Sequence, residues 1–377
     1  MSAEPAIIDA APPAEIAVAG QWKLFWLKFR RHRLAVASLA VVCLLYLVAA
    51  FAPFLAPFDP NQTNATFTYA PPQRLHLFHD GAFAPHVTGL AMTLNQESMR
   101  REFAPDPEHP VFIDFLVPAP PYRILGLIPM ETRLFGPRDA GPGTALYLLG
   151  ADRLGRDMLS RVLYGAQISL SIGLVGVVLS LVLGVTIGGI SGMVGGTTDM
   201  IIQRFIEFLR SIPTIPLWMG LAAAIPVAWP PVRTYFVITL IVSMIGWTGL
   251  AREVRGKFLA LRGEDFVTAA RLDGMSAAGI LIHHLVPSIA SHIIATLTLA
   301  IPVMILAETA LSFLGIGLQP PIISWGVLLQ EAQNIRAVSQ APWLLFVPSL
   351  AIVIAVLSLN FLGDGLRDAA DPYGHTG

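Results

Sequence analysis

Long stretches without a charged residue dominate this sequence and limit the folds open to it. The first lies between Arg33 and Asp59 and holds 25 residues, which at about 1.5 Å per helical residue is enough to cross a hydrocarbon core of roughly 30 Å. Only 13% of the residues are charged and 54% are hydrophobic, whereas soluble domains average about 25% charged residues. The sequence therefore predicts an integral membrane protein.

Further apolar runs extend this prediction to six transmembrane helices. The predicted spans are residues 34–54, 162–198, about 200–232, 234–251, a segment within 274–307, and 337–363. The second run ends in glycines between 184 and 196, so we expect one helix followed by a glycine-rich turn. Five prolines between 211 and 232 predict a kink in the third span. An even number of crossings places both termini on the same side.

The first apolar run also resembles the core of a signal peptide. Ala50-Phe51-Ala52 has the small-x-small pattern of a cleavage site. The segment before this run exceeds thirty residues, however, and Pro53 would directly follow the cut. We therefore expect an uncleaved membrane anchor.

Basic residues near the predicted spans indicate the orientation, because short cytoplasmic segments carry an excess of Lys and Arg. They gather before the first span (Lys23, Lys28, Arg30, Arg31, Arg33) and after the fourth (Arg252, Arg255, Lys257, Arg262, Arg271), whereas the short opposing loops carry only Arg233 and Arg336. Both termini are therefore predicted to be cytoplasmic. Aromatic and basic residues alternate over 22–31, which predicts an interfacial helix.

Residues 58–161 do not fit a membrane environment. They are rich in Pro, Phe, His and charge, and residues 111–117 alternate in the manner of a strand. We expect a small extracytoplasmic insertion with some β-structure on an otherwise all-α protein. A metal site and a solvated turn are both compatible with the polar group formed by His76, His79, Asp80 and His86, and the turn is the simpler interpretation.

Several function classes have no support in the sequence. There is no G-x-x-x-x-G-K-[ST] phosphate-binding loop, because the only lysines are Lys23, Lys28 and Lys257. No Ser/His/Asp or paired-carboxylate pattern stands out, and the single cysteine, Cys43, lies in an apolar run. The net charge of −1 offers no basic surface for nucleic acid. We expect a non-catalytic chain that binds no cofactor, metal or nucleic acid itself.

The loop over 252–287 carries the clearest local signal. Glu264 and Asp265 stand where acids favour a helix start, and Gly274 stands where a left-handed stop ends one. Such a helix is too short to be stable alone and needs supporting contacts. Ala269 and Ala270 would let a partner approach closely, and Ser276 can cap a second helix that leads through His283, His284 and Pro287 into the fifth span. A partner-binding helix and a plain amphipathic connector are both compatible with this pattern.

Charged residues within or beside the spans allow two interpretations each. Glu207 and Arg210 are one helical turn apart and can pair, and Glu308 lies in or near the end of the fifth span. They either line a translocation path or serve structure, and structure is favoured. Arg153, Arg156 and Asp157 precede the second span, where docking of a protein and interfacial anchoring both remain open.

Four stretches resemble a known family. In the loop, Ala269-Ala270, Gly274 and Pro287 resemble the E-A-A-x3-G-x9-I-x-L-P pattern of permease subunits of ATP-binding-cassette importers, with Thr268, His284 and Val286 as departures. Residues 149–161 with 164–170, 307–326 and 363–372 are similar to the C-type inner-membrane subunit of dipeptide and oligopeptide importers. The resemblance covers about 22–60 and 147–373, and leaves 61–146 outside the common pattern.

This resemblance implies a multi-pass protein of a bacterial inner membrane that forms half of a pore with a second, homologous permease. One or two cytoplasmic ATPases, which use ATP and Mg²⁺, would drive alternating access, and an extracytoplasmic solute-binding protein would deliver di- or oligopeptides. Glu264, Asp265, Thr268, Ala269, Ala270, Gly274 and Pro287 would then form the ATPase-coupling loop. Oligosaccharide, nickel or another small solute are alternative cargoes. A secondary transporter and an intramembrane hydrolase are alternatives of other classes.

The predicted organisation follows from these assignments. It comprises a cytoplasmic N-terminus over 1–33, a first transmembrane helix over 34–57, an extracytoplasmic insertion over 58–161, a five-helix permease core over 162–373 with the coupling loop 252–287, and a tail over 374–377.

Overall fold

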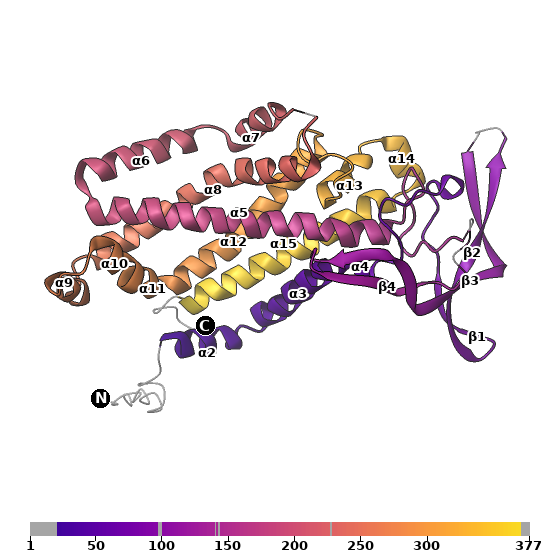
Figure 1. The fold of residues 1–377 in the computed structure, drawn as a ribbon, viewed down its shortest axis with the longest axis horizontal. Coiled ribbons are helices and arrows are strands. Elements are labelled where there is room, and N and C mark those ends of the chain that lie inside the picture. The colour runs from indigo at the N-terminus through magenta and orange to yellow at the C-terminus, as the bar shows by residue number, and fades with distance from the viewer. Residues whose placement is uncertain (1–20, 97–99, 140, 142–143, 227, 371–377) are drawn as a thin grey trace, which may run out of the picture.

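The computed structural model describes residues 21–96, 100–139, 141, 144–226 and 228–370. The predicted tail over 374–377 and the first twenty residues of the predicted N-terminal segment lie outside these ranges. The described chain forms a bundle of long helices with an antiparallel sheet at one end (Figure 1). A mostly helical membrane protein with a small β-region is therefore confirmed.

Five of the described helices are long and apolar enough to cross a membrane. These are α3 (Arg33–Ala50), α5 (Met158–Val194), α8 (Pro231–Leu261), α12 (Ala290–Phe313) and α15 (Trp343–Ala370). With 37 and 31 residues, α5 and α8 are about 55 and 46 Å long, well beyond a hydrocarbon core of roughly 30 Å. Both helices are therefore longer than a perpendicular crossing requires.

Shorter helices lie at the two ends of the bundle and along its outside. They are α2 (Gln21–Arg31), α4 (Ala52–Leu55), α6 (Gly196–Ser211), α7 (Thr214–Ala223), α9 (Asp265–Leu272), α10 (Ala277–Ile280), α11 (Val286–Ser288), α13 (Trp325–Glu331) and α14 (Ile335–Gln340), with the 3-10 turn η1 (Ala65–Phe67) and the π-helical turn η2 (Leu281–Leu285). Helices α2 and α9 and the last turns of α15 lie at one end, here called the α9 end, and the sheet lies at the other, called the sheet end (Figure 1).

The third predicted span is not one kinked helix. Helix α6 ends at Ser211, Ile212 is extended at φ −83° and ψ 128°, and α7 begins only at Thr214. Pro213 explains the break, because proline has no N–H to donate and disfavours helical geometry in the residue before it. The two helices follow one another along the outside of α5 and α8 (Figure 1).

The predicted glycine-rich turn is wrong for most of its glycines. Gly184, Gly188 and Gly192 are buried inside α5 and face α8. A Cβ on Gly184 would lie 2.8 Å from the Leu250 side chain, and one on Gly188 would collide with the Ala251 backbone. This spacing of four residues is the small-residue stripe that lets two membrane helices pack closely. The turn itself uses only the last two glycines, Gly195 and Gly196, which have φ of +68° and +57°.

Charged residues also mislead about where α8 ends. The predicted fourth span stops at 251, but the helix continues to Leu261, so the first ten residues of the loop 252–287 are helical. Val254 and Phe258 explain the extension, because their buried side chains continue the packed face of the helix.

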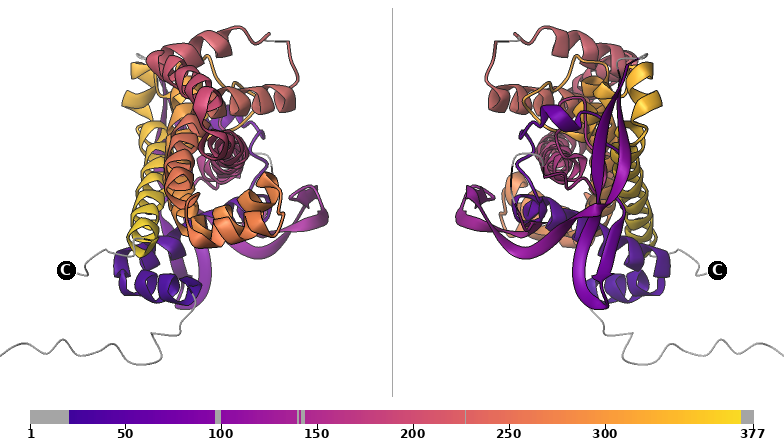
Figure 2. Two further views of the ribbon diagram at one scale, coloured as in Figure 1. Left: turned by 90° about the vertical axis from the view of Figure 1, so that its left-hand side faces the viewer. Right: turned by 90° about the vertical axis from the view of Figure 1, so that its right-hand side faces the viewer.

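Four antiparallel strands make up the sheet, in the order β1-β2-β3-β4. They are β1 (Leu75–His79), β2 (Ala82–Asn95), β3 (Arg100–Ile124) and β4 (Ile128–Pro137). Viewed from the sheet end, the strands cross in front of the helices (Figure 2). Gln73 connects β2 to the segment between β4 and α5, because its Nε2 donates to the carbonyl oxygens of Thr88 and Ala145, each at 2.9 Å.

Candidate functional site

Helix α9 is held to its own chain by one apolar face. The side chains of Val267 and Ala270 are 0% and 5% exposed. They pack in a cluster with Phe258 of α8 and with Ile280 and Leu285 of the segment after α9. At eight residues, α9 is too short to be stable in isolation, so this packing keeps it folded.

The opposite face of α9 is open. Thr268 and Ala269 are exposed, and Phe266 and Leu272 are exposed although they are large and apolar. Leu272 is 84% exposed. The prediction that both alanines face a partner is wrong for Ala270, because that side chain is the contact between α9 and its own chain.

Both ends of α9 are defined by backbone contacts. Gly274 has φ +78°, and the Met275 N–H donates to the Ala270 carbonyl at 3.0 Å, which is the left-handed stop expected of this glycine. Glu264 occupies the N-cap position but makes no side-chain capping hydrogen bond, and Asp265 lies in the first turn. The predicted capping by the Glu264 side chain is therefore wrong, and the acids favour the helix start only through the helix dipole.

The connection from α9 to α12 is a chain of short pieces. Ser276 caps α10, as its Oγ accepts the Gly279 N–H at 3.1 Å. Helix α10, turn η2 and α11 follow without a gap, and Pro287 is exposed in α11. Ile289, at φ −112° and ψ 11°, then separates α11 from α12. The predicted second helix is therefore interrupted just before the membrane helix.

Polar contacts join the helices that carry α9. Arg255 of α8 donates to Asp199 of α6, with Nε–Oδ1 and Nη2–Oδ2 distances of 2.5 and 2.6 Å. Thr296 of α12 donates its Oγ1 hydrogen to Glu253 of α8 at 2.8 Å. Helices α6, α8 and α12 thus form a cross-linked frame, and α9 rests on this frame through apolar contacts.

The predicted intramembrane charges have different partners from those expected. Glu207 pairs with Arg204 at 2.8 Å, and both side chains are exposed, so the predicted pairing with Arg210 is wrong. Glu308 is 0% exposed in α12 and accepts hydrogen bonds from the hydroxyls of Ser312 and Ser324, each at 2.7 Å. Because Ser324 is the N-cap of α13, Glu308 fastens α13 to α12.

At the sheet end a buried ion network holds the start of α5 to α13. Arg156 donates to Asp152 at 2.6 Å and to Glu331 at 2.8 Å. Arg161 contacts the same two carboxylates, at 3.0 Å from Glu331, and is 1% exposed. The sequence pattern missed this network because Glu331 lies far along the chain. Arg156 is therefore a structural residue, whereas Arg153 is exposed.

Asp157 caps α5 beside this network. Its Oδ2 accepts both the N–H and the hydroxyl of Ser160, each at 2.7 Å. Burial raises the pKa of the Asp157 carboxyl to about 6, and the hydrogen bonds from Ser160 only partly oppose this.

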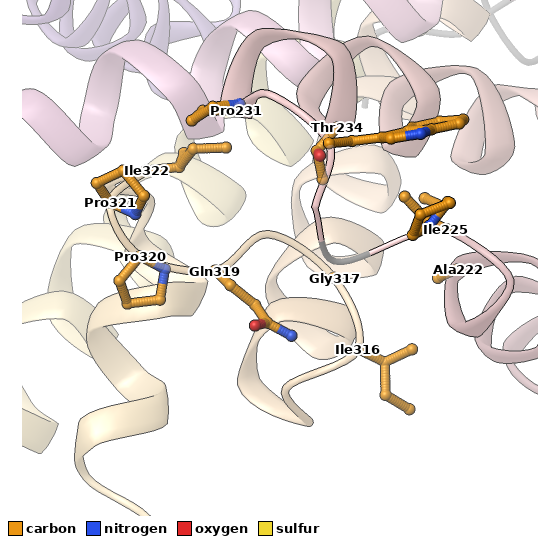
Figure 3. Close-up of a pocket in the computed structure, with 12 residues that line it drawn as sticks. Ala222, Ile225, Pro231, Thr234, Ile316, Gly317, Gln319, Pro320, Pro321 and Ile322 are labelled. Atoms are coloured by element: carbon orange, nitrogen blue, oxygen red, sulfur yellow. The ribbon is translucent and has the colours of Figure 1, made fainter.

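A cavity of about 180 Å³ opens between the α7–α8 connection and the loop between α12 and α13. Thr234, Gln319 and Pro321 are among the residues around it (Figure 3). The Arg233 guanidinium stacks 3.6 Å from the centre of the Trp229 ring on the same connection.

Three histidines of the sheet contact one another, His76 stacked on His86 and His79 edge-on to His86. His86 lies 5.2 Å from His76 and 5.1 Å from His79, measured between ring centres. Within the described ranges no group of three or more His, Cys, Asp and Glu side chains is arranged to hold a metal ion.

Comparison with known sequences identifies the chain. The family described as the inner membrane component of binding-protein-dependent transport systems matches residues 184–373. A second family, the N-terminal transmembrane domain of oligopeptide transport permease C, matches residues 20–72. The chain belongs to the first of these families, the inner membrane components of binding-protein-dependent transport systems.

Relatives of the permease agree over most of its length. It is 30% identical over 371 residues to the oligopeptide transport system permease protein OppC of Bacillus subtilis (strain 168), covering 98% of this chain and 96% of the relative. The corresponding protein of Haemophilus influenzae is 39% identical over 60% of this chain and 70% of its own length. The first alignment therefore spans nearly the whole of both chains.

One solved structure also matches the permease. It is a structure of inward-facing conformations of the MetNI methionine ABC transporter, with a TM-score of 0.46 and 17% identity, covering 57% of this chain and 98% of the other. The family and the five long apolar helices make the chain a multi-pass inner-membrane transport component.

Proposed function

We propose that the permease forms half of the pore of an ATP-driven importer and moves peptides by alternating access. A second, homologous permease completes the pore, and one or two cytoplasmic ATPases supply the energy. An extracytoplasmic solute-binding protein delivers the cargo. The chain itself performs no covalent chemistry, and ATP and Mg²⁺ bind to the partner ATPases.

In this proposal the α9 end lies in the cytoplasm and the sheet outside. Helices α6 and α7 together make a crossing between α5 and α8, which brings the total to six. The basic residues of α2 and of the 252–271 segment support this orientation, because they gather at the α9 end. Both termini are then cytoplasmic.

The exposure of one face of α9 is the observation that carries the proposal. Its buried face ties it to the frame of α6, α8 and α12, and its exposed face offers Phe266, Thr268 and Leu272 to a partner. A partner that binds this face differently before and after nucleotide-driven closure would shift the frame between two states. The cytoplasmic ATPases are the partners in position to do so.

Peptide is the proposed cargo because several relatives are named as oligopeptide or dipeptide transport permeases. Oligosaccharide, nickel or another small solute remain alternative cargoes for the same architecture. Uptake assays with each class, using the cognate binding protein, discriminate among them.

The left-handed stop of α9 provides the test. Gly274→Val places a β-branched side chain at φ +78°, where it is strained whatever the free space. We expect ATP-driven uptake of a labelled tripeptide into proteoliposomes to fall at least tenfold, while the binding protein captures the peptide normally. Gly263→Val is the matched control, because Gly263 has an ordinary φ and, like Gly274, has no atom within 4 Å of an added Cβ. Unchanged uptake by Gly274→Val contradicts the coupling role.

The same preparation tests the other transport class. A secondary transporter would move solute without ATPases, so uptake driven by an ion gradient through the permease alone would overturn the proposal. Retention of a second permease and ATPases through purification in mild detergent is the expected result.

A further inference from the structure

A large cleft separates the sheet from the helices at the sheet end. It has a volume of about 740 Å³ and lies between η1 with its following residues, the start of β3, and the junction of α14 with α15. This volume falls within the range of roughly 300 to 1,000 Å³ that is usual for small-ligand sites, which often lie where two parts of a protein meet. None of the residues proposed above for transport lines it.

Two aromatic walls of the cleft are fixed in place. Tyr69 has φ +57°, which is unusual for a bulky residue, and its N–H donates to the Asp152 carbonyl at 2.9 Å. Trp343 donates its Nε1 hydrogen to the Ala151 carbonyl at 2.9 Å and lies against Gly150, where a Cβ would come within 2.5 Å of that nitrogen. Backbone strain held by surrounding contacts is often found at binding sites.

Arg101 supplies the charge. Its Nη1 donates to the Ala65 carbonyl and to the Thr68 hydroxyl, the latter at 2.7 Å. Both contacts use one nitrogen of the guanidinium and orient the group in the wall of the cleft. The edge formed by Nε and Nη2, which a carboxylate engages with two parallel hydrogen bonds, takes no part in these contacts.

Phe103 completes an apolar surface next to this charge. Its ring stacks on Phe67, with 6.1 Å between ring centres, and lines the cleft with Tyr69 and Trp343. A positive guanidinium beside three aromatic rings suits a ligand that has a carboxylate next to an apolar side chain.

Two charged residues line the cleft, Arg101 and Glu102. The nearest carboxylates of the ion network, Asp152 and Glu331, are each bonded to Arg156 and Arg161. Burial and the nearby carboxylates of Glu331 and Asp152 raise the pKa of the Tyr69 hydroxyl, and the exposed Arg153 guanidinium opposes this only in part. The Arg101 guanidinium is therefore the positive group that the lining of the cleft offers to an anion.

We propose that this cleft binds the carboxyl-terminal residue of a short peptide on the outside of the membrane. The terminal carboxylate pairs with Arg101, and the last side chain lies against Phe103, Tyr69 and Trp343. The site is distinct from the cavity between the α7–α8 connection and the loop between α12 and α13, and it gives the insertion a role in holding cargo beside the permease. The proposal rests on the peptide cargo proposed above.

Photolabelling tests it directly. The probe is the tritiated tripeptide Ala-Ala-p-benzoylphenylalanine, applied to the purified full-length permease without binding protein, ATPases or ATP. We expect saturable labelling that maps to residues 65–71, 101–103 or 340–343. The same probe with a C-terminal amide is expected to bind at least tenfold more weakly, because it cannot form the charged pair. Equal binding of acid and amide, or saturable labelling only elsewhere, overturns the proposal without any variant.

Variants sharpen the result. Arg101→Gln is expected to weaken the acid probe at least tenfold and leave the amide unchanged. Arg123→Gln is the matched control, since Arg123 is an exposed arginine on the same strand outside the cleft. Equal losses in both variants contradict the site, as does displacement of the probe by anionic lipid vesicles but not by unlabelled Ala-Ala-Phe.

The two proposals fail separately. Gly274→Val is expected to lower uptake at least tenfold and leave photolabelling intact. Loss of labelling in a complex that still imports peptide overturns only the cleft, whereas labelling by a chain that never assembles with ATPases overturns only the importer.

Discussion

The two ends of the permease are held together by different forces. At the sheet end, Asp152, Arg156, Arg161 and Glu331 are buried and bonded to one another. At the other end, α9 is attached through buried apolar side chains, and within the described residues no side-chain hydrogen bond caps its N-terminus.

The sheet end has its charges paired within the chain, whereas α9 has an exposed face that a partner can still cover. Buried ion pairs tolerate little movement, because a charge that moves away leaves its partner buried and uncompensated. Apolar contacts are less directional, so an element held by them can shift with a partner at small cost. The sheet end is therefore expected to move as a rigid body, and α9 is expected to take its final position only in the complex.

Removing one charge from the network is the largest perturbation we predict. Arg161→Gln leaves the carboxylates of Asp152 and Glu331 with one cation in place of two. Breaking a buried ion pair lowers the free energy of unfolding by about 3 to 5 kcal/mol. Thermal unfolding of the purified permease should show it clearly. Arg153→Gln, an exposed neighbour, is expected to change little. A stability loss below 1 kcal/mol in Arg161→Gln would remove the contrast between the two ends.

The next perturbation acts on the helices that link the ends. Gly188→Ala forces a methyl group against the Ala251 backbone, and overpacking of this kind costs about 1 to 3 kcal/mol. Gly220→Ala is the control, because an added Cβ there meets nothing within 4 Å. Equal thermal stability of the two variants would show that α5 and α8 separate easily and do not transmit movement between the ends.

Much of this architecture follows from the sequence, because long apolar runs and local capping residues act within a single helix. The runs identify all five long helices, and Gly274 and Ser276 mark the end of α9 and the start of α10 as built. The same local signals misjudge boundaries where tertiary contacts decide. Gly188 looked like part of a turn, but the close approach of α8 stabilises helix there.

Residues that meet only in three dimensions escaped prediction. Arg156 and Glu331 are 175 positions apart, and no spacing in the sequence connects them. Glu207 was assigned the wrong partner because Arg204 and Arg210 are equally placed at one helical turn on either side. The inward direction of Ala270 was missed for a similar reason, since an alanine suits a buried contact and an open surface equally well.

The apolar attachment of α9 gives a smaller predicted effect. Val267→Ala removes two buried methyl groups and costs about 2 kcal/mol, which should speed amide hydrogen exchange within α9 about thirtyfold if the helix opens locally. Thr268→Ala, the exposed neighbour, is expected to leave exchange unchanged but to weaken ATPase binding. Slow exchange in Val267→Ala would mean that α9 is fixed by contacts other than its buried face.

The smallest expected effect concerns pH at the sheet end. Burial raises the pKa of Asp157 to about 6. The folded protein therefore keeps a proton on this carboxyl up to a higher pH than the unfolded chain does. The stabilisation by this proton is present at acid pH and is lost as the pH rises through about 6, so stability should increase by about 1 kcal/mol from pH 7 to pH 5.

Asp157→Asn isolates this contribution. The amide oxygen can still accept from Ser160 but carries no charge to bury, so the variant should be at least as stable as the parent at pH 7 and should lose its advantage by pH 5. The difference between the two melting curves, taken at both pH values, removes the titration of every other group. A constant difference would mean that water reaches Asp157, and the sheet end would then be less tightly closed than its buried ion pairs indicate.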